Sequence, residues 1–248
     1  MKEKYNYIEE GSGETIILLH GLMGAVSNFK TTIEDLPKHG YRVILPMLPL
    51  YTLPILKTNV KQLAKFITNF TNDLNISKFS ILGNSLGGHI GLILALKNPD
   101  KVDKLILSGS SGLYENTLGG AFPKRGDYNY IKNKTEEVFF DPKTATKELV
   151  DEVFEIVNNR EKVLRVLMMA KSAMRHNMKE ELPNILQKTC IIWGKNDKIT
   201  PPKVGLEFHN DIPNSDLFWI DNCGHAPMIE QPQEFNKILA KWLKNKTS

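Results

Sequence analysis

One serine of this chain lies in a sequence that favours a sharply turned backbone and an exposed hydroxyl group. Ser85 is the central residue of GNSLG at positions 83–87, which matches the pattern G-x-S-x-G. The apolar run 79–83 predicts a buried strand, and the run after Ser85 predicts a helix that stops at Pro99. A serine on such a turn is strained, and it lies beside the free N–H groups of the helix N-terminus. We therefore predict that Ser85 is a nucleophile; the alternative is a glycine-rich turn that only lets strand and helix pack.

A serine hydroxyl is a weak nucleophile without a neighbouring base. His225 lies in DNCGHAPMIEQP, just after the last predicted strand, where an open parallel sheet has its ligand crevice. His89 lies one turn along the helix after Ser85, and His20 precedes a glycine-containing loop that it would brace. The other histidines lie in polar surroundings without a loop signature: His39, His176 and His209. His225 is therefore the predicted base.

The base needs a carboxylate that fixes its tautomer and stabilises its charged form. Asp197 lies in a loop after the strand pattern CIIWG, whereas Asp221 ends the next predicted strand, four residues before His225. The loop after the strand pattern KLILSG is the other place for such an acid, and it offers serines but no carboxylate. We predict that Asp197 is the acid, because the resulting chain order of Ser, Asp and His accompanies this kind of serine turn in an open α/β sheet.

Hydrolysis by a serine also needs N–H donors for the negative oxygen that develops on the attacked carbonyl. The sequence LHGLMG at 19–24 ends the first predicted strand, and its glycines let backbone N–H groups turn inward. The amides of Leu22 and Leu86 are the predicted donors, with Met23 as the fallback. An ordinary glycine-containing loop is the alternative. Met23 and Asn84, the sequence neighbours of these groups, are candidate substrate contacts.

These residues lie in a chain that alternates short apolar runs with longer helical patterns. The alternation predicts an α/β fold, with a mostly parallel central sheet flanked by helices. It stops between about residues 110 and 186, where only helical patterns occur. We therefore expect a core of residues 1–112 and 187–248 and a helical insertion of residues 113–186. The predicted strands are 15–21, 41–46, 79–83, 104–109, 190–194 and 217–221, and the clearest helices are 60–74, 85–99 and 232–245.

Composition argues against several classes of protein. The chain has 248 residues, 41% of them hydrophobic, and a net charge of +4 carried by scattered lysines. No dense basic stretch points to nucleic acid, and no apolar run reaches the roughly 18 residues of a membrane span. The polar first residues lack a signal-peptide core, and Cys190 and Cys223 lack metal-ligand spacing. We expect a cytoplasmic protein with reduced thiols, no nucleic-acid partner and no membrane span; homo-oligomerisation stays open.

Together, the four stretches around Leu22, Ser85, Asp197 and His225 resemble the α/β-hydrolase superfamily, over nearly the whole chain. Within it, GNSLGG with CGH, followed by EQPQEFN, is most similar to the branch of esterases and carbon–carbon bond hydrolases. The latter act on ring-cleavage products of aromatic degradation. The resemblance implies the α/β-hydrolase fold with a helical lid in the position of the insertion. It also implies hydrolysis through a serine, without a cofactor or metal.

Two departures from the family pattern concern the crevice. Many relatives carry Asp-x-Pro-Gly-x-Gly after the second central strand, whereas residues 46–54 read PMLPLYTLP. We expect an apolar crevice wall there, with a locally packed loop as the alternative. The carbon–carbon bond hydrolases hold a substrate carboxylate with a lid arginine, and Arg160 is the candidate by position. Arg165 and Arg175 compete with it, and a solvated surface arginine is the alternative.

The main hypothesis is a serine hydrolase that cleaves a small or medium apolar carboxylic ester through Ser85, His225 and Asp197. A second hypothesis is a carbon–carbon bond hydrolase of vinylogous diketo acids, as the resemblance implies. A third is a non-catalytic relative that binds its ligand in the same crevice. In each case the expected partner is a small molecule, and flexible methionines of the insertion would line its site or pack on the core: Met168, Met169 and Met174.

Overall fold

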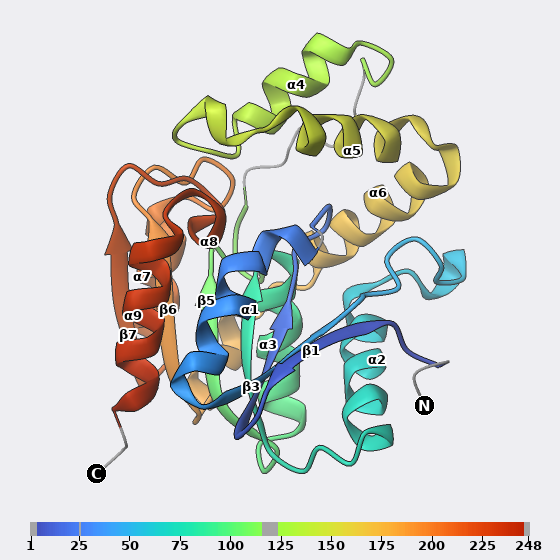
Figure 1. Ribbon diagram of the computed structural model, residues 1–248. Coiled ribbons are helices and arrows are strands. Elements are labelled where there is room, and N and C mark those ends of the chain that lie inside the picture. The colour runs from blue at the N-terminus through green and yellow to red at the C-terminus, as the bar shows by residue number, and fades with distance from the viewer. Residues whose placement is uncertain (1–3, 25, 116–123, 246–248) are drawn as a thin grey trace.

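A seven-stranded sheet runs through the centre of the molecule (Figure 1). The structure, a computed structural model, describes residues 4–24, 26–115 and 124–245. The strands follow one another in space as β1-β3-β2-β4-β5-β6-β7. β1 pairs antiparallel with β3, and all other neighbouring strands are parallel. The strands are β1 Tyr7–Gly11, β2 Glu14–Leu19, β3 Tyr41–Pro46, β4 Phe79–Asn84, β5 Val102–Ser108, β6 Lys188–Gly194 and β7 Ser215–Ile220.

Helices cover both faces of the sheet, which is why the central strands are mostly apolar. Successive strand residues point to opposite faces, so Ile81 of β4 packs in one apolar core and Leu82 packs in the other. The core around Ile81 also receives α2, α3 and α7, and the core around Leu82 receives α1 and α9. The bounds of these helices are α1 Lys30–Asp35, α2 Val60–Asp73, α3 Leu86–Lys97, α7 Pro202–Asp211 and α9 Pro232–Lys244, and a short α8 spans Pro227–Glu230.

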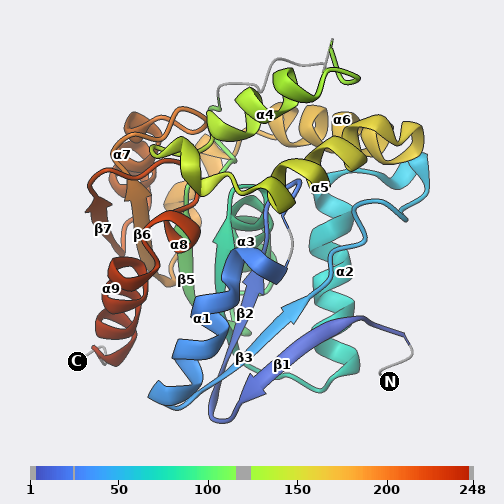
Figure 2. The ribbon, with the colours of Figure 1, turned by 45° about the horizontal axis from the view of Figure 1, so that its top comes forward.

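Three helices between β5 and β6 lie across the ends of the central strands (Figures 1 and 2). They are α4 Tyr128–Glu136, α5 Lys147–Asn158 and α6 Arg160–Arg175. A small apolar core of their own joins them, built around Ile131 and Val157. We use the name helical lid for residues 113–186; its described part contains no strand.

Strand β1 lies outside the predicted strands, which began at residue 15. Its residues are half-buried or exposed, because the strand lies at one edge of the sheet. The sequence YIEEG therefore carries no buried apolar run. The strand is held by its pairing with β3, from Tyr7 opposite Pro46 to Gly11 opposite Arg42.

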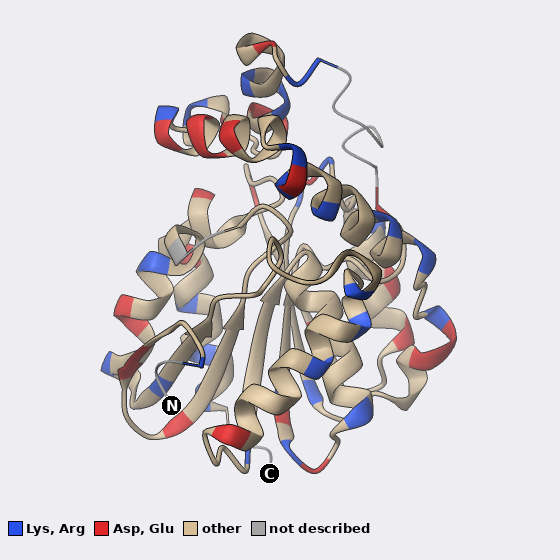
Figure 3. Cartoon of the chain, turned by 90° about the vertical axis from the view of Figure 1, so that its right-hand side faces the viewer, with Lys and Arg blue, Asp and Glu red and all other residues tan. Residues whose placement is uncertain are grey.

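Charged residues lie mostly on the outer helices and loops, with both signs interspersed, whereas the central strands are almost free of them (Figure 3). This distribution matches the scattered lysines of the sequence and shows no stripe of a single sign in this view. Within the described residues, no helix combines the length and the apolar character that crossing a bilayer requires.

Candidate active site

Ser85 lies at a sharp turn between the end of β4 and the start of α3. Its backbone has φ 54° and ψ −120°, a left-handed conformation that is strained for a residue with a side chain. A Cβ on Gly87 would collide with the carbonyl of Leu19, so this position needs glycine. The Ser85 amide donates to Ser108 O at 3.1 Å and its carbonyl accepts from Ser111 N at 3.1 Å, so the loop after β5 holds the turn in place.

His225 and Asp197 form a buried pair at the ends of neighbouring strands. Nδ1 of His225 lies 2.9 Å from Oδ2 of Asp197. A carboxylate oxygen only accepts, so Nδ1 carries the proton and Nε2 of His225 keeps a free lone pair. Asp197 is 3% exposed, and the hydroxyl of Thr200 donates to the same Oδ2 at 2.8 Å. Its other oxygen accepts from the amides of Ile199 and Thr200, at 2.8 and 2.9 Å. These bonds satisfy the buried carboxylate and aim it at His225.

The competing carboxylate, Asp221, lies in a different environment. Its side chain is 74% exposed and pairs with the Nζ of Lys195 at 2.7 Å. The structure therefore brings Asp197, and not Asp221, to His225.

Opposing effects act on the pKa of His225. Burial lowers this pKa, but the negative charge of Asp197 and its hydrogen bond raise it more, and Glu115 adds a smaller effect in the same direction. The net result is a pKa above the ordinary histidine value. Because Nε2 of His225 is the available acceptor, the residue can take a proton from a neighbouring hydroxyl.

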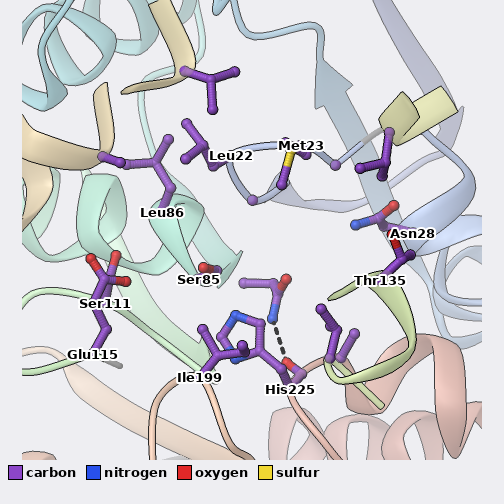
Figure 4. Close-up of a pocket in the computed structure, with 18 of the residues that line it drawn as sticks. Leu22, Met23, Asn28, Ser85, Leu86, Ser111, Glu115, Thr135, Ile199 and His225 are labelled. Carbon is purple, nitrogen blue, oxygen red and sulfur yellow. Dashed lines mark hydrogen bonds between the residues drawn. The ribbon is translucent and has the colours of Figure 1, made fainter. Parts of the chain in front are cut away.

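Ser85 and His225 line the same cavity, which has a volume of about 310 Å³. Figure 4 shows their side chains in the same part of this cavity. The lid supplies much of the apolar wall, including Val138, Val153, Val166, Leu167 and Met174. The cavity can therefore hold a small or medium apolar molecule beside the serine.

Leu22, Met23 and Leu86 also line this cavity. Leu86 is the first residue of α3, so its amide has no acceptor within the helix. Leu22 and Met23 are the central residues of a turn that the Gly24 amide closes on Gly21 O at 3.1 Å, and central amides stay free in such a turn. The structure thus places all three predicted residues at the cavity, and the choice between the Leu22 and Met23 amides stays open.

Asn84 lines the cavity as expected, but the nitrogen of its side-chain amide already makes two hydrogen bonds. Its Nδ2 donates to Ser108 O at 2.9 Å and to His225 O at 3.1 Å; the second bond is the dashed line in Figure 4. Asn84 therefore ties the turn at Ser85 to the loop of residues 221–226, which carries His225 and is called the histidine loop below. This is a different role from the predicted substrate contact.

Two further residues hold His225, and the sequence analysis missed both. Gly109 has φ +50°, and a Cβ on it would lie 2.7 Å from His225 O and 3.0 Å from Nδ1. The amide of His225 donates to the carbonyl of Val138, in the lid, at 2.9 Å. The run SGSSG around Gly109 was a visible signal of a close backbone approach, whereas no sequence signal marks a backbone carbonyl such as that of Val138.

The predicted role of Arg160 is not supported, because this residue does not line the cavity. It is exposed at the first position of α6, where Asn159 caps the helix at the corner between α5 and α6. Its competitors are engaged elsewhere: Arg165 donates to Leu53 O at 2.9 Å, and Arg175 lines a separate cleft beside α2. The described lining residues of the cavity therefore include no arginine.

The expected apolar crevice wall at residues 46–54 is also wrong, since none of these residues lines the cavity. Leu48 and Leu50 are buried in the core around Ile81, so the alternative of a locally packed loop holds. The three methionines of α6 have different outcomes. Met174 lines the cavity and Met169 is buried in the core around Ile81, as the two expectations had it, whereas Met168 lines the separate cleft beside α2.

The two other histidines weighed as bases are engaged away from the cavity. His20 braces its loop, with Nδ1 donating to Gly21 O at 2.9 Å. His89 is fully buried and shares a hydrogen bond with His176 at 2.9 Å between Nε2 and Nδ1. Burial, with a smaller effect of the nearby His176, lowers the pKa of His89 to about 3. His89 is therefore a neutral contact between α3 and the end of α6.

Within the described residues, no three side chains of His, Cys, Asp or Glu are grouped so that they could hold a metal ion. Cys190 and Cys223 are free and buried. Burial raises the pKa of both thiols.

Comparison with known proteins agrees with the fold. Residues 14–138 match the family described as alpha/beta hydrolase fold. The chain is 29% identical to 2-hydroxy-6-oxononadienedioate/2-hydroxy-6-oxononatrienedioate hydrolase 2 of Pseudomonas putida, over 97% of this chain and 91% of that protein.

Two solved structures are similar over nearly their whole length. An alpha/beta hydrolase enzyme from the metagenome of sediments of the lagoon of Mar Chica, Morocco, is 42% identical with a TM-score of 0.81, covering 98% of this chain and 96% of that chain. A meta-cleavage product hydrolase of Pseudomonas fluorescens IP01 has a TM-score of 0.84 at 24% identity, covering 98% and 95%, a likeness of fold. With half of the chain matching the family and the sheet, the serine turn and the lid helices in place, this protein belongs to the α/β-hydrolase family.

Proposed function

We propose that this enzyme is a serine hydrolase in which Ser85 attacks a carbonyl carbon, His225 is the base and Asp197 orients it. One observation carries the proposal. A strained Ser85 lines the same cavity as His225, and buried Asp197 holds the Nδ1 proton of His225. His225 Nε2 is then the acceptor for the hydroxyl proton.

The first half of the reaction forms an acyl-enzyme. The Ser85 oxygen bonds to the carbonyl carbon while Nε2 of His225 takes its proton. The negative oxygen of the tetrahedral intermediate accepts hydrogen bonds from the Leu86 amide and from Leu22 or Met23. The intermediate then collapses, and the leaving group departs with the proton of His225. In the second half, water attacks the acyl group by the same route and releases the acid, which restores Ser85.

Two classes of substrate fit this chemistry. In a carboxylic ester the leaving group is an alcohol, and the mostly apolar cavity supports such a substrate. In a vinylogous diketo acid the bond broken joins the attacked carbonyl carbon to its carbon neighbour. The names of the relatives support the second class better, because the Pseudomonas putida relative is named a dienedioate hydrolase, whereas ester hydrolysis has support only at the level of the family.

The cavity adds one observation to this comparison. A diacid substrate needs positive partners, and the described lining residues supply Lys134 and Lys171 but no arginine. The Nζ of Lys134 already binds Glu137 Oε1 and Oε2 at 2.9 and 2.7 Å, and Lys171 is exposed. The wall around the serine therefore favours an uncharged carbonyl compound.

A direct experiment tests the serine first and the substrate second. A fluorophosphonate probe should label the enzyme rapidly at Ser85 and leave Ser85→Ala unlabelled. The Ser85→Ala variant should lose a factor of about 10⁴ to 10⁶ in kcat, because nucleophile and base act as a unit. Turnover of the variant within about tenfold of the parent would contradict the proposal. Binding of ligands without labelling by the probe would instead support the third hypothesis, a non-catalytic relative.

The substrate class is then read from two parallel assays. One uses nitrophenyl esters of increasing acyl length, and the other uses a dienoate diketo acid whose cleavage bleaches its absorbance. Higher kcat/KM on the diketo acid would assign carbon–carbon bond cleavage, and higher kcat/KM on the esters would assign ester hydrolysis.

We also propose that the lid, residues 113–186, selects the substrate while residues 1–112 and 187–248 carry the chemistry. The support is positional. Ser85, Asp197 and His225 lie outside the lid, and the lid lines much of the cavity wall.

A further inference from the structure

A lone carboxylate lies in the cavity wall and has no part in the proposed reaction. Glu115 follows β5, is half-buried and lines the same cavity as Ser85 and His225 (Figure 4). Among the described residues, no hydrogen bond or ion pair to its carboxylate occurs. Most acidic residues lie on the surface or pair with a cation, so a half-buried unpaired carboxylate beside a reaction centre calls for a physical explanation.

The carboxylate of Glu115 interacts electrostatically with His225. Burial raises the pKa of Glu115, and the attraction of His225 opposes this rise. In return, Glu115 helps to raise the pKa of His225. The two groups therefore interact electrostatically across the cavity.

The other charged groups of the cavity do not cancel this carboxylate. Lys134 is already held by Glu137, and Lys171 is exposed, where water and salt weaken its field. Asp197, behind His225, is also negative and is satisfied by its own hydrogen bonds. An anionic substrate group next to Glu115 would thus meet a like charge in a mostly apolar surrounding, where repulsion is stronger than in water.

We propose that Glu115 sets the charge selectivity of the cavity, admitting neutral and cationic carbonyl substrates and rejecting those with a carboxylate tail. This inference rests on the proposed function, since it concerns the substrate of the same site. It separates this enzyme from the dienedioate hydrolase that it resembles, whose name specifies a substrate with two carboxylates.

Matched substrates test the proposal in the active enzyme. We compare kcat/KM for 4-nitrophenyl pentanoate and for the mono-4-nitrophenyl ester of succinic acid, which replaces the end of the chain by a carboxylate. The parent should prefer the neutral ester, and Glu115→Gln should reduce that preference by a factor of about 10 to 100, the range expected for one like charge at close range in a partly screened site. Glu152→Gln removes the same charge from an exposed position of α5 outside the cavity, so it should leave the preference unchanged. Equal effects of Glu115→Gln on both esters would overturn the proposal.

The pH dependence supplies a second readout. Glu115 is negative only above its pKa, so the preference of the parent for the neutral ester should grow as the pH rises through the range just above the ordinary glutamate value. Protonation of His225 in the free enzyme lowers kcat/KM for both esters by the same factor, so it cancels in the ratio of the two kcat/KM values. Above about pH 5.5, where the carboxylate of the succinate ester is itself ionised, the ratio for Glu115→Gln should stay flat, and a ratio that is flat for the parent too would overturn the proposal.

A binding experiment separates this inference from the proposed function. Pentananilide and succinic acid monoanilide are amides that differ in the same way as the esters, and calorimetry can measure their binding to Ser85→Ala with and without Glu115→Gln. Selectivity for the neutral amide that disappears with Glu115→Gln supports the inference even if no ester is turned over. Rapid probe labelling of Ser85 without any selectivity supports the proposed function and overturns this inference.

Discussion

Asp197 and Asp221 follow neighbouring strands, but only one of them lies where its charge acts on His225. Asp197 is buried and hydrogen-bonded to Nδ1, whereas Asp221 pairs with Lys195 at the surface. An amide in place of the Asp197 carboxylate would favour the wrong tautomer of His225, a change worth about 10⁴ in kcat in the serine-protease example from which the rule comes. We expect a loss of this order for Asp197→Asn and less than about twofold for Asp221→Asn, a surface change. Steady-state kinetics of both variants decides, and a larger loss for Asp221→Asn would identify a different acid.

The protonation of His225 predicts the acid side of the pH profile. His225 must be neutral to take the proton of Ser85, so activity is lost as the pH falls through its pKa. Since that pKa is raised, mainly by Asp197 against the effect of burial, the half-point of kcat/KM should lie above pH 6.5. Measurement of kcat/KM for a neutral ester across the range checks this. A half-point well below 6.5 would mean that burial outweighs Asp197.

Sequence reasoning located Ser85, Asp197 and His225 because each lies in a short pattern tied to the end of one strand. It placed Arg160 in the site on a family analogy, and the structure puts that residue at an exposed helix corner. It missed Glu115 and Val138, whose importance depends on how the lid folds back over the sheet. Contacts of this kind depend on tertiary structure, which local patterns do not contain.

Among the elements, the junction between the lid and the histidine loop is tightly packed. A Cβ on Gly224 would lie 2.5 Å from the Val138 carbonyl oxygen and 2.9 Å from atoms of Phe139. Gly224→Ala should therefore push the lid away from His225, lowering the unfolding free energy by about 1–3 kcal/mol, as overpacking does. We expect kcat to fall at least about tenfold, because small displacements of catalytic groups have effects of this size.

Gly126 provides the matched control for this change. It also lies in the lid, but a Cβ there would meet no atom of a described residue within 4 Å. Gly126→Ala should change the unfolding free energy by less than about 0.5 kcal/mol and leave kcat unaltered. Equal behaviour of the two alanine variants would show that the junction does not position His225.

Helices with an apolar face of their own were predictable from the sequence, whereas the edge strand of the sheet was not. Helices α2 and α9 each present one apolar stripe, so their helical spacing is visible in the sequence. Strand β1 is half-buried or exposed along its length and depends on pairing with β3, so no local pattern marks it. Residues 46–54 were mispredicted for a related reason. Their apolar character is visible in the sequence, but whether such residues face the cavity or pack in the core, as Leu48 and Leu50 do, depends on tertiary structure.

At the scale of the whole molecule, the two cysteines report on the integrity of the core around Leu82, which contains both of them. Cys190 lies in β6 and Cys223 lies in the histidine loop, and both are fully buried with raised thiol pKa values. Native protein should therefore react very slowly with a disulfide reagent such as dithiobisnitrobenzoate, and denatured protein should show two reactive thiols. Mass spectrometry of the labelled peptides assigns the sites. Fast labelling of Cys223 alone would reveal local opening of the histidine loop in the folded protein.

The hydrogen bond from the His225 amide to the Val138 carbonyl makes hydrogen exchange a readout of lid opening. That amide proton can exchange with deuterium only while the bond is broken, so its exchange rate reports the fraction of molecules in which the lid is lifted from the histidine loop. A tight inhibitor that closes the cavity should slow this exchange, whereas Gly224→Ala should speed it up. Because the same bond fixes the backbone of His225, each lifting of the lid also releases the base from its position, so a molecule whose lid is open is expected to be transiently inactive.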